Sequence, residues 1–427
     1  MRLQLFCALV FLAGTSQSFA AEAVTYKGTI GKSPIILELA EANESGEFVG
    51  RYAYLSKGGD IPLHGTTNVD GGLAIQEEAP CTKELCRDAK NEIVEKPPIG
   101  AEWTLRESND EQELTGSWKD IKSGKTLALK FTRVASRELP DGDGKTTLYS
   151  LDPSSAARAE DDSMITKADL PYDFLKMDVP LKKGAEVTYG DGVYRLDLDP
   201  RVGIEFPTIV KIGNTDVAPI NDYLHQQRLQ FSFNPIYCLS KAYLGMDWSG
   251  SGGEGTMGYD DGPPSVTVQL LTPRLLGFSE GGSFYCGGAY PDHHYDYLLA
   301  DVRSGKALVP ETLLKGWVAR DADGKIVDPS TVEDRNDLRY GPSEELVKYV
   351  NDNRDKSDAS REEECGLADL VTSNLGVYFT QTDMVFTLKN LPHVIFACGD
   401  DLVTVPLKDA RPLLTDAGAR YFAVLDR

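Results

Sequence analysis

The stretch LELAEANESGEFVGRYAYLSKGGDIPL, residues 37–63, decides the fold of the first part of the chain, because a second copy follows it. It aligns without a gap to WTLRESNDEQELTGSWKDIKSGKTLAL, residues 103–129, which begins 66 residues later. Glycines and large apolar residues occupy equivalent positions in the two copies: Leu37 and Trp103, Gly50 and Gly116, Tyr52 and Trp118, and Gly58 and Gly124. Apolar and polar residues alternate in each copy, as they do in half-buried strands. Each copy therefore predicts a strand, a polar turn, a strand, a glycine turn and a third strand.

A three-stranded meander exposes its edges and needs a partner for stability. Two copies can cover each other, so residues 24–135 predict a small antiparallel sandwich or barrel with approximate twofold symmetry. The segment between the copies carries Cys81, Cys86 and two prolines, and we expect an ordered excursion there. Residues 136–165 are polar and poor in large apolar side chains, which is typical of a linker.

Residues 166–427 predict an α+β domain with antiparallel sheet. Strand patterns and helix patterns are grouped in this part rather than regularly alternating, which favours that class. The sequence predicts a hairpin around residues 190–192 and a helix that Asp216 caps. It also predicts a tight turn at residues 281–282 and a strand over residues 393–399.

Residues 1–20 predict a secretory signal peptide. Arg2 supplies the positively charged n-region, and residues 3–13 form the apolar h-region. The small residues Ser18 and Ala20 place cleavage after Ala20. Nothing downstream approaches the roughly 18 to 20 continuous apolar residues of a membrane helix. We therefore expect a soluble periplasmic or secreted protein that does not insert into a membrane after cleavage.

Six cysteines remain once Cys7 is removed with the signal peptide. An even number of cysteines in an exported chain predicts disulfides. Position along the chain guides the predicted pairs, which are Cys81 with Cys86, Cys238 with Cys286, and Cys365 with Cys398. A zinc site is disfavoured because the first of these pairs has no matching Cys or His pair nearby. No cofactor is predicted.

The chain is strongly acidic. It has 44 Lys and Arg residues against 66 Asp and Glu residues, a formal net charge of −22, and loss of Arg2 with the signal peptide makes this −23. A field of this sign repels nucleic acid and anionic membranes and attracts cationic partners. Solubility alone would also account for the charge. We expect no nucleic-acid partner.

The segment GGSFYCGGAYPDHHYDY, residues 281–297, holds two of the five histidines side by side. If it is extended, Asp292, His294 and Asp296 share one face, and His293 lies on the other. The segment can form part of a metal site, an acid–base pair, a recognition surface, or a glycine-bracketed strand without a ligand. A metal site lacks a third strong ligand in the sequence, and acid–base catalysis lacks an identified nucleophile. The chain has no Gly-x-Ser-x-Gly or His-Glu-x-x-His motif.

Residues 285–291, Tyr-Cys-Gly-Gly-Ala-Tyr-Pro, are followed by YDYLLADVRSGKALVPETLL. Together they resemble the RsiV-type extracytoplasmic domain, whose Tyr-x-Gly-Gly-Ala-His-Pro motif precedes a strand ending in Asp, a Gly-Lys turn and a short helix. The stretch GVYFTQTDMVFTLKNLPHVIFACGDDLVTVPLKDARPLL is similar to the closing strands and helix of that family. FPTIVKIGNTDVAPINDYLHQQ resembles its companion domain, which also accompanies PdaC-type peptidoglycan deacetylases. The resemblance covers about residues 185–415 and leaves out the repeat domain.

The resemblance implies an α+β fold and, from the best-known family members, recognition of lysozyme by an anti-sigma factor. The residues at motif positions are Tyr285, Gly287, Gly288, Ala289 and Pro291. Three features differ from the family. Tyr290 stands where the family usually has His, and a cleavable signal stands where an anti-sigma factor has a cytoplasmic segment and a membrane helix. The sequence also shows no resemblance to a deacetylase catalytic domain.

We therefore expect an exported soluble binding protein. The sequence favours recognition of a ligand over catalysis. Its expected ligand is a cationic cell-wall-active protein such as lysozyme, or a peptidoglycan fragment. The candidate binding residues are Tyr285, Gly287, Gly288, Tyr290, Pro291, Asp292, His293, His294 and Asp296. The alternative is an exported cell-wall or glycan hydrolase that uses His294 with Asp292 or Asp296. A third hypothesis is an interaction module whose repeat domain docks a partner.

Overall fold

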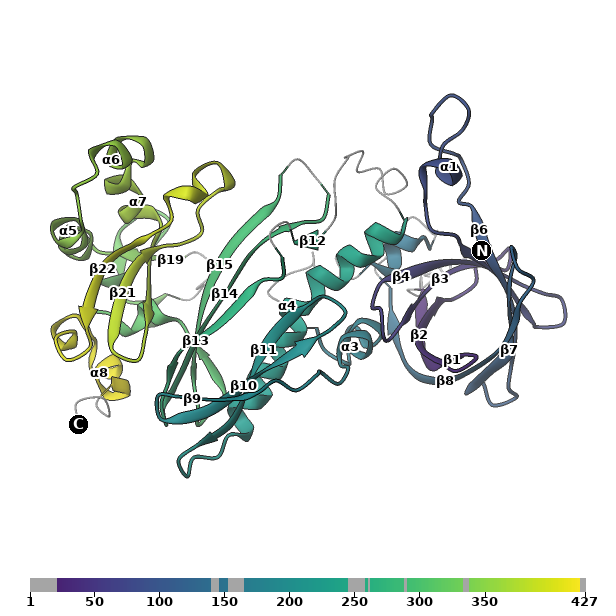
Figure 1. The fold of residues 1–427 in the computed structure, drawn as a ribbon, viewed down its shortest axis with the longest axis horizontal. Coiled ribbons are helices and arrows are strands. Elements are labelled where there is room, and N and C mark those ends of the chain that lie inside the picture. The colour runs from purple at the N-terminus through teal and green to yellow at the C-terminus, as the bar shows by residue number, and fades with distance from the viewer. Residues whose placement is uncertain are drawn as a thin grey trace, which may run out of the picture.

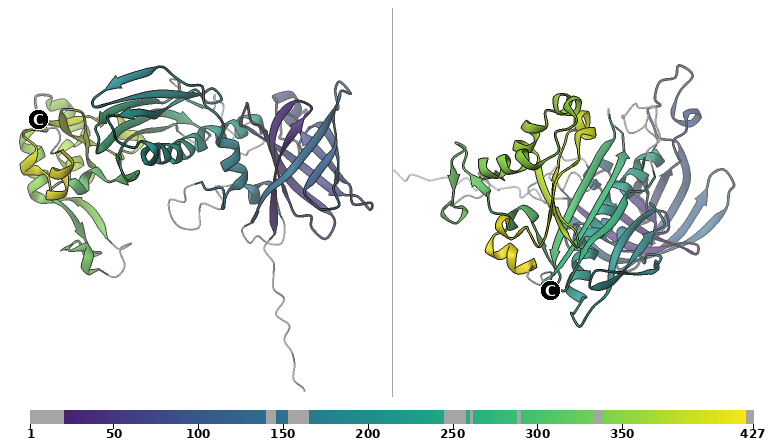
Figure 2. Two further views of the ribbon diagram at one scale, coloured as in Figure 1. Left: turned by 90° about the horizontal axis from the view of Figure 1, so that it is seen from below. Right: turned by 60° about the vertical axis from the view of Figure 1, so that its left-hand side comes forward.

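The fold was analysed in a computed structural model, which describes residues 21–139, 146–152, 165–244, 258–259, 262–287, 290–332 and 338–422. The expected signal peptide, Gly288 and parts of the expected linker lie outside these residues. Figure 1 and the left view of Figure 2 show a barrel at one end of the molecule and a small α+β unit at the other, with a long helix between them. No helix in the described ranges is both long and apolar enough to cross a membrane.

The N-terminal repeat folds into a closed antiparallel barrel in which β1 pairs with both β2 and β8. Closure leaves no unpaired edge, which resolves the predicted choice between sandwich and barrel. Its strands are β1 (Glu22–Ile30), β2 (Ser33–Ala40), β3 (Glu47–Tyr54), β4 (Asp60–Thr67), β5 (Leu73–Glu78), β6 (Ile99–Glu107), β7 (Glu113–Asp120) and β8 (Thr126–Glu138). A short helix, α1 (Lys83–Cys86), lies in the excursion between β5 and β6.

The two copies of the repeat pair their strands in the same register. Equivalent cross-strand pairs are Leu37 with Tyr52 and Trp103 with Trp118, and Gly50 with Leu63 and Gly116 with Leu129. The shared glycines have a steric cause. A Cβ on Gly116 would lie 1.8 Å from the carbonyl oxygen of Thr104, and one on Gly50 would lie 2.8 Å from that of Glu38. Neighbouring strands therefore approach too closely for a side chain at either position.

The barrel interior is packed with apolar side chains, the largest of which are Trp103, Tyr52 and Phe131. One carboxylate, Glu77, is buried among them. Its Oε2 atom accepts hydrogen bonds from the indole nitrogens of Trp103 at 2.8 Å and Trp118 at 2.7 Å. Burial raises the pKa of Glu77, and these hydrogen bonds partly oppose the rise. The barrel interior is thus filled by side chains, and a pocket of about 790 Å³ that Phe48, Ile75 and Trp103 help to line lies against this core.

The middle of the molecule contains two antiparallel sheets and the long helix α4 (Ala218–Leu244). The predicted hairpin at residues 190–192 joins β9 (Glu186–Tyr189) to β10 (Gly192–Asp199), and β10 pairs with β11 (Ile204–Ile212). The second sheet has the order β12-β14-β15-β16, with β13 also pairing β14. Its strands are β12 (Gly258–Tyr259), β13 (Ser265–Leu271), β14 (Leu275–Tyr285), β15 (Asp292–Asp301) and β16 (Lys306–Leu308).

The predicted turn at Gly281 and Gly282 is wrong. Both glycines lie inside β14, where they pair with Tyr295 and His294 of β15. A Cβ on Gly281 would lie 2.5 Å from the ring of Tyr295, so the glycine makes room for that ring rather than for a turn. The chain reverses only after Tyr285, where Gly287 adopts a φ of 86°.

The C-terminal unit packs helices around the sheet β20-β21-β22 and a smaller sheet β18-β17-β19. Its strands are β17 (Trp317–Arg320), β18 (Ile326–Val327), β19 (Arg339–Pro342), β20 (Leu375–Phe379), β21 (Asp383–Leu388) and β22 (Asp401–Pro406). Its α-helices are α5 (Glu344–Asn353), α6 (Ala359–Cys365), α7 (Leu367–Ser373) and α8 (Asp416–Phe422). Short 3-10 turns are η2 (Pro310–Leu313), η3 (Pro329–Thr331), η5 (His393–Cys398) and η6 (Arg411–Leu413).

The predicted strand at residues 393–399 is also wrong, because this segment forms η5. Pro392 precedes it, and Cys398 at its end is bonded to Cys365 at the end of α6. The covalent tie holds a coiled segment against α6 and leaves Val394 83% exposed. An alternating apolar pattern carries no information about such a tie.

Two of the three predicted disulfides are present, Cys81–Cys86 and Cys365–Cys398. The third predicted pair, Cys238 and Cys286, is not joined by a disulfide in the structure. The two residues are nevertheless neighbours, because Sγ of Cys238 lies 3.4 Å from the carbonyl oxygen of Tyr285, next to Cys286. A disulfide between them stays a prediction for the exported protein.

A buried network of six charges joins the barrel wall to the short helix α3 (Pro171–Met177). Its members are Glu38, Arg51, Asp60, Arg137, Asp173 and Lys176, so three positive charges balance three negative ones. Arg51 lies 2.7 Å from Glu38 and 2.8 Å from Asp173. Lys176 of α3 lies 2.7 Å from Asp60 of the barrel. Burial alone would raise the pKa of Asp173, but Arg51 and Lys176 lower it.

Substituting Arg51 by Met is expected to destabilise the protein by about 3–5 kcal/mol, because three buried carboxylates lose their shared cation. The matched control is Arg106→Met, whose ion pair with Asp70 is exposed and is worth at most about 1 kcal/mol. Urea denaturation of both variants measures the difference. Equal losses in the two variants would show that the network contributes no more than a surface pair.

Candidate functional site

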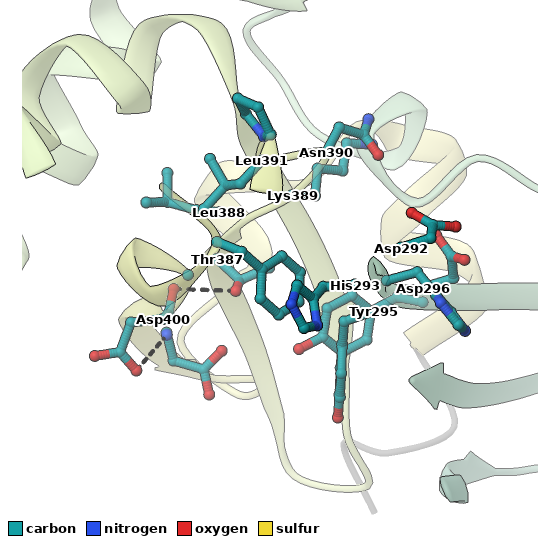
Figure 3. Close-up of a pocket in the computed structure, with 16 residues that line it drawn as sticks. Asp292, His293, Tyr295, Asp296, Thr387, Leu388, Lys389, Asn390, Leu391 and Asp400 are labelled. Atoms are coloured by element: carbon teal, nitrogen blue, oxygen red, sulfur yellow. Dashed lines mark hydrogen bonds between the residues drawn. The ribbon is translucent and has the colours of Figure 1, made fainter. Parts of the chain in front are cut away.

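A groove of about 770 Å³ lies between the first half of β15 and the segment that follows β21, over residues 387–401. Figure 3 shows His293 and Tyr295 in the middle of this groove, with Leu388 to one side and Asp292 and Asp296 to the other. The groove therefore joins residues of the HHYDY segment to residues about 100 positions later in the sequence.

The two adjacent histidines point to opposite faces of β15, as strand alternation requires. His294 reaches back to β14, where its Nε2 atom lies 3.0 Å from Oε2 of Glu280. His293 turns to η5, where its ring stacks on His393 with centroids 4.8 Å apart. The pair is thus not a joint metal or catalytic site.

Four rings form a continuous stack along one side of the groove. Tyr290 stacks on His393 at 5.1 Å, His393 on His293 at 4.8 Å, and His293 on Phe396 at 5.2 Å. Tyr290 at the end of the stack is 66% exposed. The stack offers flat faces, which bind planar or cationic groups.

A second group of rings continues the same face of β15. Tyr297 stacks on Tyr378 of β20 with centroids 4.1 Å apart, and the Tyr378 hydroxyl donates a hydrogen bond to Asp401 at 2.9 Å. Burial raises the pKa of both Tyr297 and Tyr378 well above the ordinary range, with nearby Asp401 adding to the rise. Both hydroxyls are therefore neutral at physiological pH.

His294 is held by a buried carboxylate that the sequence analysis did not name. Its hydrogen bond to Glu280 raises its pKa, burial lowers it, and Asp296 and Asp292 contribute smaller increases. Its Nδ1 atom is buried and has no hydrogen-bond partner among the described residues. The sequence hypothesis paired His294 with Asp292 or Asp296, but its direct partner is Glu280 on the neighbouring strand.

Four aspartates make the groove acidic: Asp292, Asp296, Asp400 and Asp401. Burial raises the pKa of Asp296, and the nearby charge of Asp292 raises it further. Asp400 is paired with Arg361 at 2.8 Å. Lys389, the sole lysine or arginine of the groove lining, is engaged in an ion pair with Glu311. Within the described lining, neither Asp292 nor Asp296 has an ion pair with a lysine or arginine, and the charges of His294 and Lys389 only lower the pKa of Asp296.

The other predicted residues fall around the groove rather than in one cluster. Tyr285 ends β14, Gly287 and Pro291 lie in the following turn, and Gly288 is outside the described residues. The two remaining histidines lie elsewhere. His64 contacts Glu78 on the barrel, and His225 contacts Asp178 beside α4.

Sequence reasoning missed Phe396 and Asp401, which line the groove, and Glu280, Tyr378 and His393, which contact lining residues from outside it. His393 and Phe396 were assigned to a strand, and no spacing in the sequence links them to His293. No group of three or more potential ligands among the described residues is arranged to hold a metal ion. The groove combines aromatic faces with carboxylates, which suits recognition of cationic groups.

No protein-family model and no curated protein matches this chain.

The raised pKa of His294 predicts a pH-dependent contribution to stability. The charged imidazole gains its partner on folding, so the contribution is complete below its ordinary value of 6.5 and is lost as pH rises through the folded value. Titration of the histidine ring signals by NMR should give His294 a midpoint above pH 6.5. The signal of His294 is identified by its absence from the spectrum of the His294→Gln variant. Glu280→Gln should lower the titration midpoint. A midpoint at or below 6.5 in the unaltered protein would contradict the assigned pairing.

Proposed function

We propose that the protein is an exported recognition protein whose groove between β15 and η5 binds a basic protein surface, with lysozyme as the first candidate. The observation that carries this proposal is that four aspartates line the groove together with the rings of His293 and Phe396, which belong to the stack that Tyr290 and His393 extend beyond the lining. A peptidoglycan fragment is the other candidate ligand from the sequence, and the acidic lining favours the basic protein.

The carboxylates supply the electrostatic part of the argument. Asp296 is an exposed residue near Asp292. Desolvation of its carboxylate raises its pKa, the charge of His294 lowers it, and the like charge of Asp292 raises it. An incoming ammonium or guanidinium group is attracted to both carboxylates and offsets the repulsion between them. Lys389 does not provide that charge alone, since Glu311 already engages it.

The aromatic rings supply flat surfaces that fit a planar cationic group. A guanidinium group is planar, stacks on aromatic faces and forms paired hydrogen bonds to carboxylates. Tyr290 and Val394 stand exposed at the open end of the ring stack, where they can contact the apolar stem of an arginine or lysine. Aromatic anchors of this kind are typical of protein-binding surfaces.

The charge of the whole chain supports the same class of partner. A formal net charge of −22 attracts a basic protein over distance and raises its association rate. The resemblance of residues 285–291 to the RsiV-type motif also points to lysozyme, and Tyr290, which replaces the usual histidine of that motif, lies in the ring stack.

A hydrolase remains the second candidate because of one observation. His294 is oriented by Glu280, its Nδ1 atom has no partner within the described ranges, and Asp296 nearby has a raised pKa. An oriented imidazole beside such a carboxyl group is an arrangement used in acid–base catalysis. Release of soluble fragments from purified cell wall, lost in His294→Gln, would favour this candidate over recognition.

The recognition proposal predicts saturable binding to lysozyme at about 0.15 M salt, where the attraction of distant surface charges is largely screened. The double substitution Asp292→Asn with Asp296→Asn should weaken binding at least about tenfold, the equivalent of about 1.4 kcal/mol. Isothermal titration calorimetry measures both affinities. The substitution preserves side-chain size and removes only the two charges.

The matched control is Glu44→Gln with Glu95→Gln, two exposed positions of the barrel part. This pair changes the net charge by the same amount and should leave the affinity within about twofold, because it acts only through the screened long-range field. Equal weakening in the two double variants, or no binding in the unaltered protein, would overturn the proposal.

A further inference from the structure

A second groove, of about 790 Å³, lies beyond the Lys389–Asn390 turn and shares only these two residues with the first. It is lined by parts of η2, β17, β19, the start of α5 and the end of α7. Small-molecule sites commonly measure about 300–1,000 Å³. The size therefore suits a ligand of a few residues rather than a folded partner.

Two arginines stand side by side in this groove. Arg320 of β17 and Arg339 of β19 are direct cross-strand partners, and both line the groove. Like charges directly opposite each other on a sheet are destabilising. Arg320 donates one hydrogen bond to the carbonyl oxygen of Pro342 at 2.8 Å, and Arg339 has no ion pair among the described residues. The pair has guanidinium donors to spare, the arrangement that binds a carboxylate.

The same groove contains a buried carboxylate oxygen without a donor. Glu311 is only 2% exposed, and its Oε1 atom is taken by Lys389. Its Oε2 atom is buried and has no hydrogen-bond partner in the described part of the chain. An unsatisfied buried acceptor costs about 1–3 kcal/mol. Since Lys389 already balances the charge, what Glu311 lacks is a hydrogen-bond donor, which a backbone N–H can supply, rather than a second cation.

The arginine pair and the unpartnered oxygen of Glu311 together favour a ligand with a negative charge at one end and an N–H group close to that charge. A sulfate ion brings no donor, and phosphate, which has an O–H group, carries on average more negative charge than a carboxylate and is repelled more strongly by Glu311 and Glu344 in the same lining. Trp317 and Tyr340 also line the groove and offer contact for small side chains. We infer that this second groove binds the carboxyl-terminal end of a short peptide, with the terminal carboxylate on the Arg320–Arg339 pair and a backbone amide donating to Glu311.

The probe is N-acetyl-Ala-Ala, which carries one carboxylate and two amide N–H groups. Saturation-transfer NMR with the whole protein should show saturable binding. Amidating the carboxylate, or methylating both amide nitrogens, should each weaken binding at least about tenfold, because each change removes one of the two required groups. Inorganic phosphate should not compete at equal concentration.

Arg339→Gln should weaken binding of N-acetyl-Ala-Ala at least about fivefold while leaving the thermal midpoint unchanged, since Arg339 is exposed. The matched control is Arg411→Gln, another exposed arginine of the same unit, which should bind like the unaltered protein. The double substitution at Asp292 and Asp296 should also bind normally, so the result is independent of the lysozyme proposal. Absence of binding, equal binding of the amide or the methylated peptide, competition by phosphate, or unchanged binding by Arg339→Gln would each overturn the inference.

Discussion

The buried cluster around Arg51 is the interaction on which the arrangement of the molecule depends. It ties the outer wall of the barrel to α3, and it lies next to a second tie in which the backbone N–H of Asp60 donates to Ser240 of α4. Separating these surfaces would expose or orphan several buried charges at once, a cost of several kcal/mol. The barrel therefore acts as a fixed platform for the long helix that leads to the middle and C-terminal parts of the molecule (Figure 1).

Two further constraints shape the first groove. The β14–β15 register sets which histidine faces which way, and places His294 against Glu280 and His293 toward η5. The disulfide between Cys365 and Cys398 then holds η5 against α6. A strand and a covalently tied turn thus bring His293 and His393 together. The short turn at Lys389 and Asn390 separates this acidic, aromatic groove from the basic one beyond it.

The two matching segments made an antiparallel sandwich or barrel predictable, because apolar alternation and glycine positions are local and occur in both segments, whereas the choice of a closed barrel came from the structure. Alternation along β15 also gave the correct opposite faces for His293 and His294. The predictions that failed depend on contacts between residues that are far apart in the sequence. Glycine at 281 was interpreted as a turn, whereas it makes room for a ring from the next strand. Glu280 and His393 could not be assigned to the site, since strand pairing and a disulfide bring them there and neither leaves a spacing pattern in the sequence.

The central claim is that a basic partner occupies the groove between β15 and η5. Hydrogen–deuterium exchange with and without lysozyme, at physiological salt, tests the location directly. The account predicts slower exchange in the presence of lysozyme over residues 290–297 and 387–401, with the barrel strands unchanged. Protection confined to the barrel, or spread evenly over the acidic surface, would contradict it.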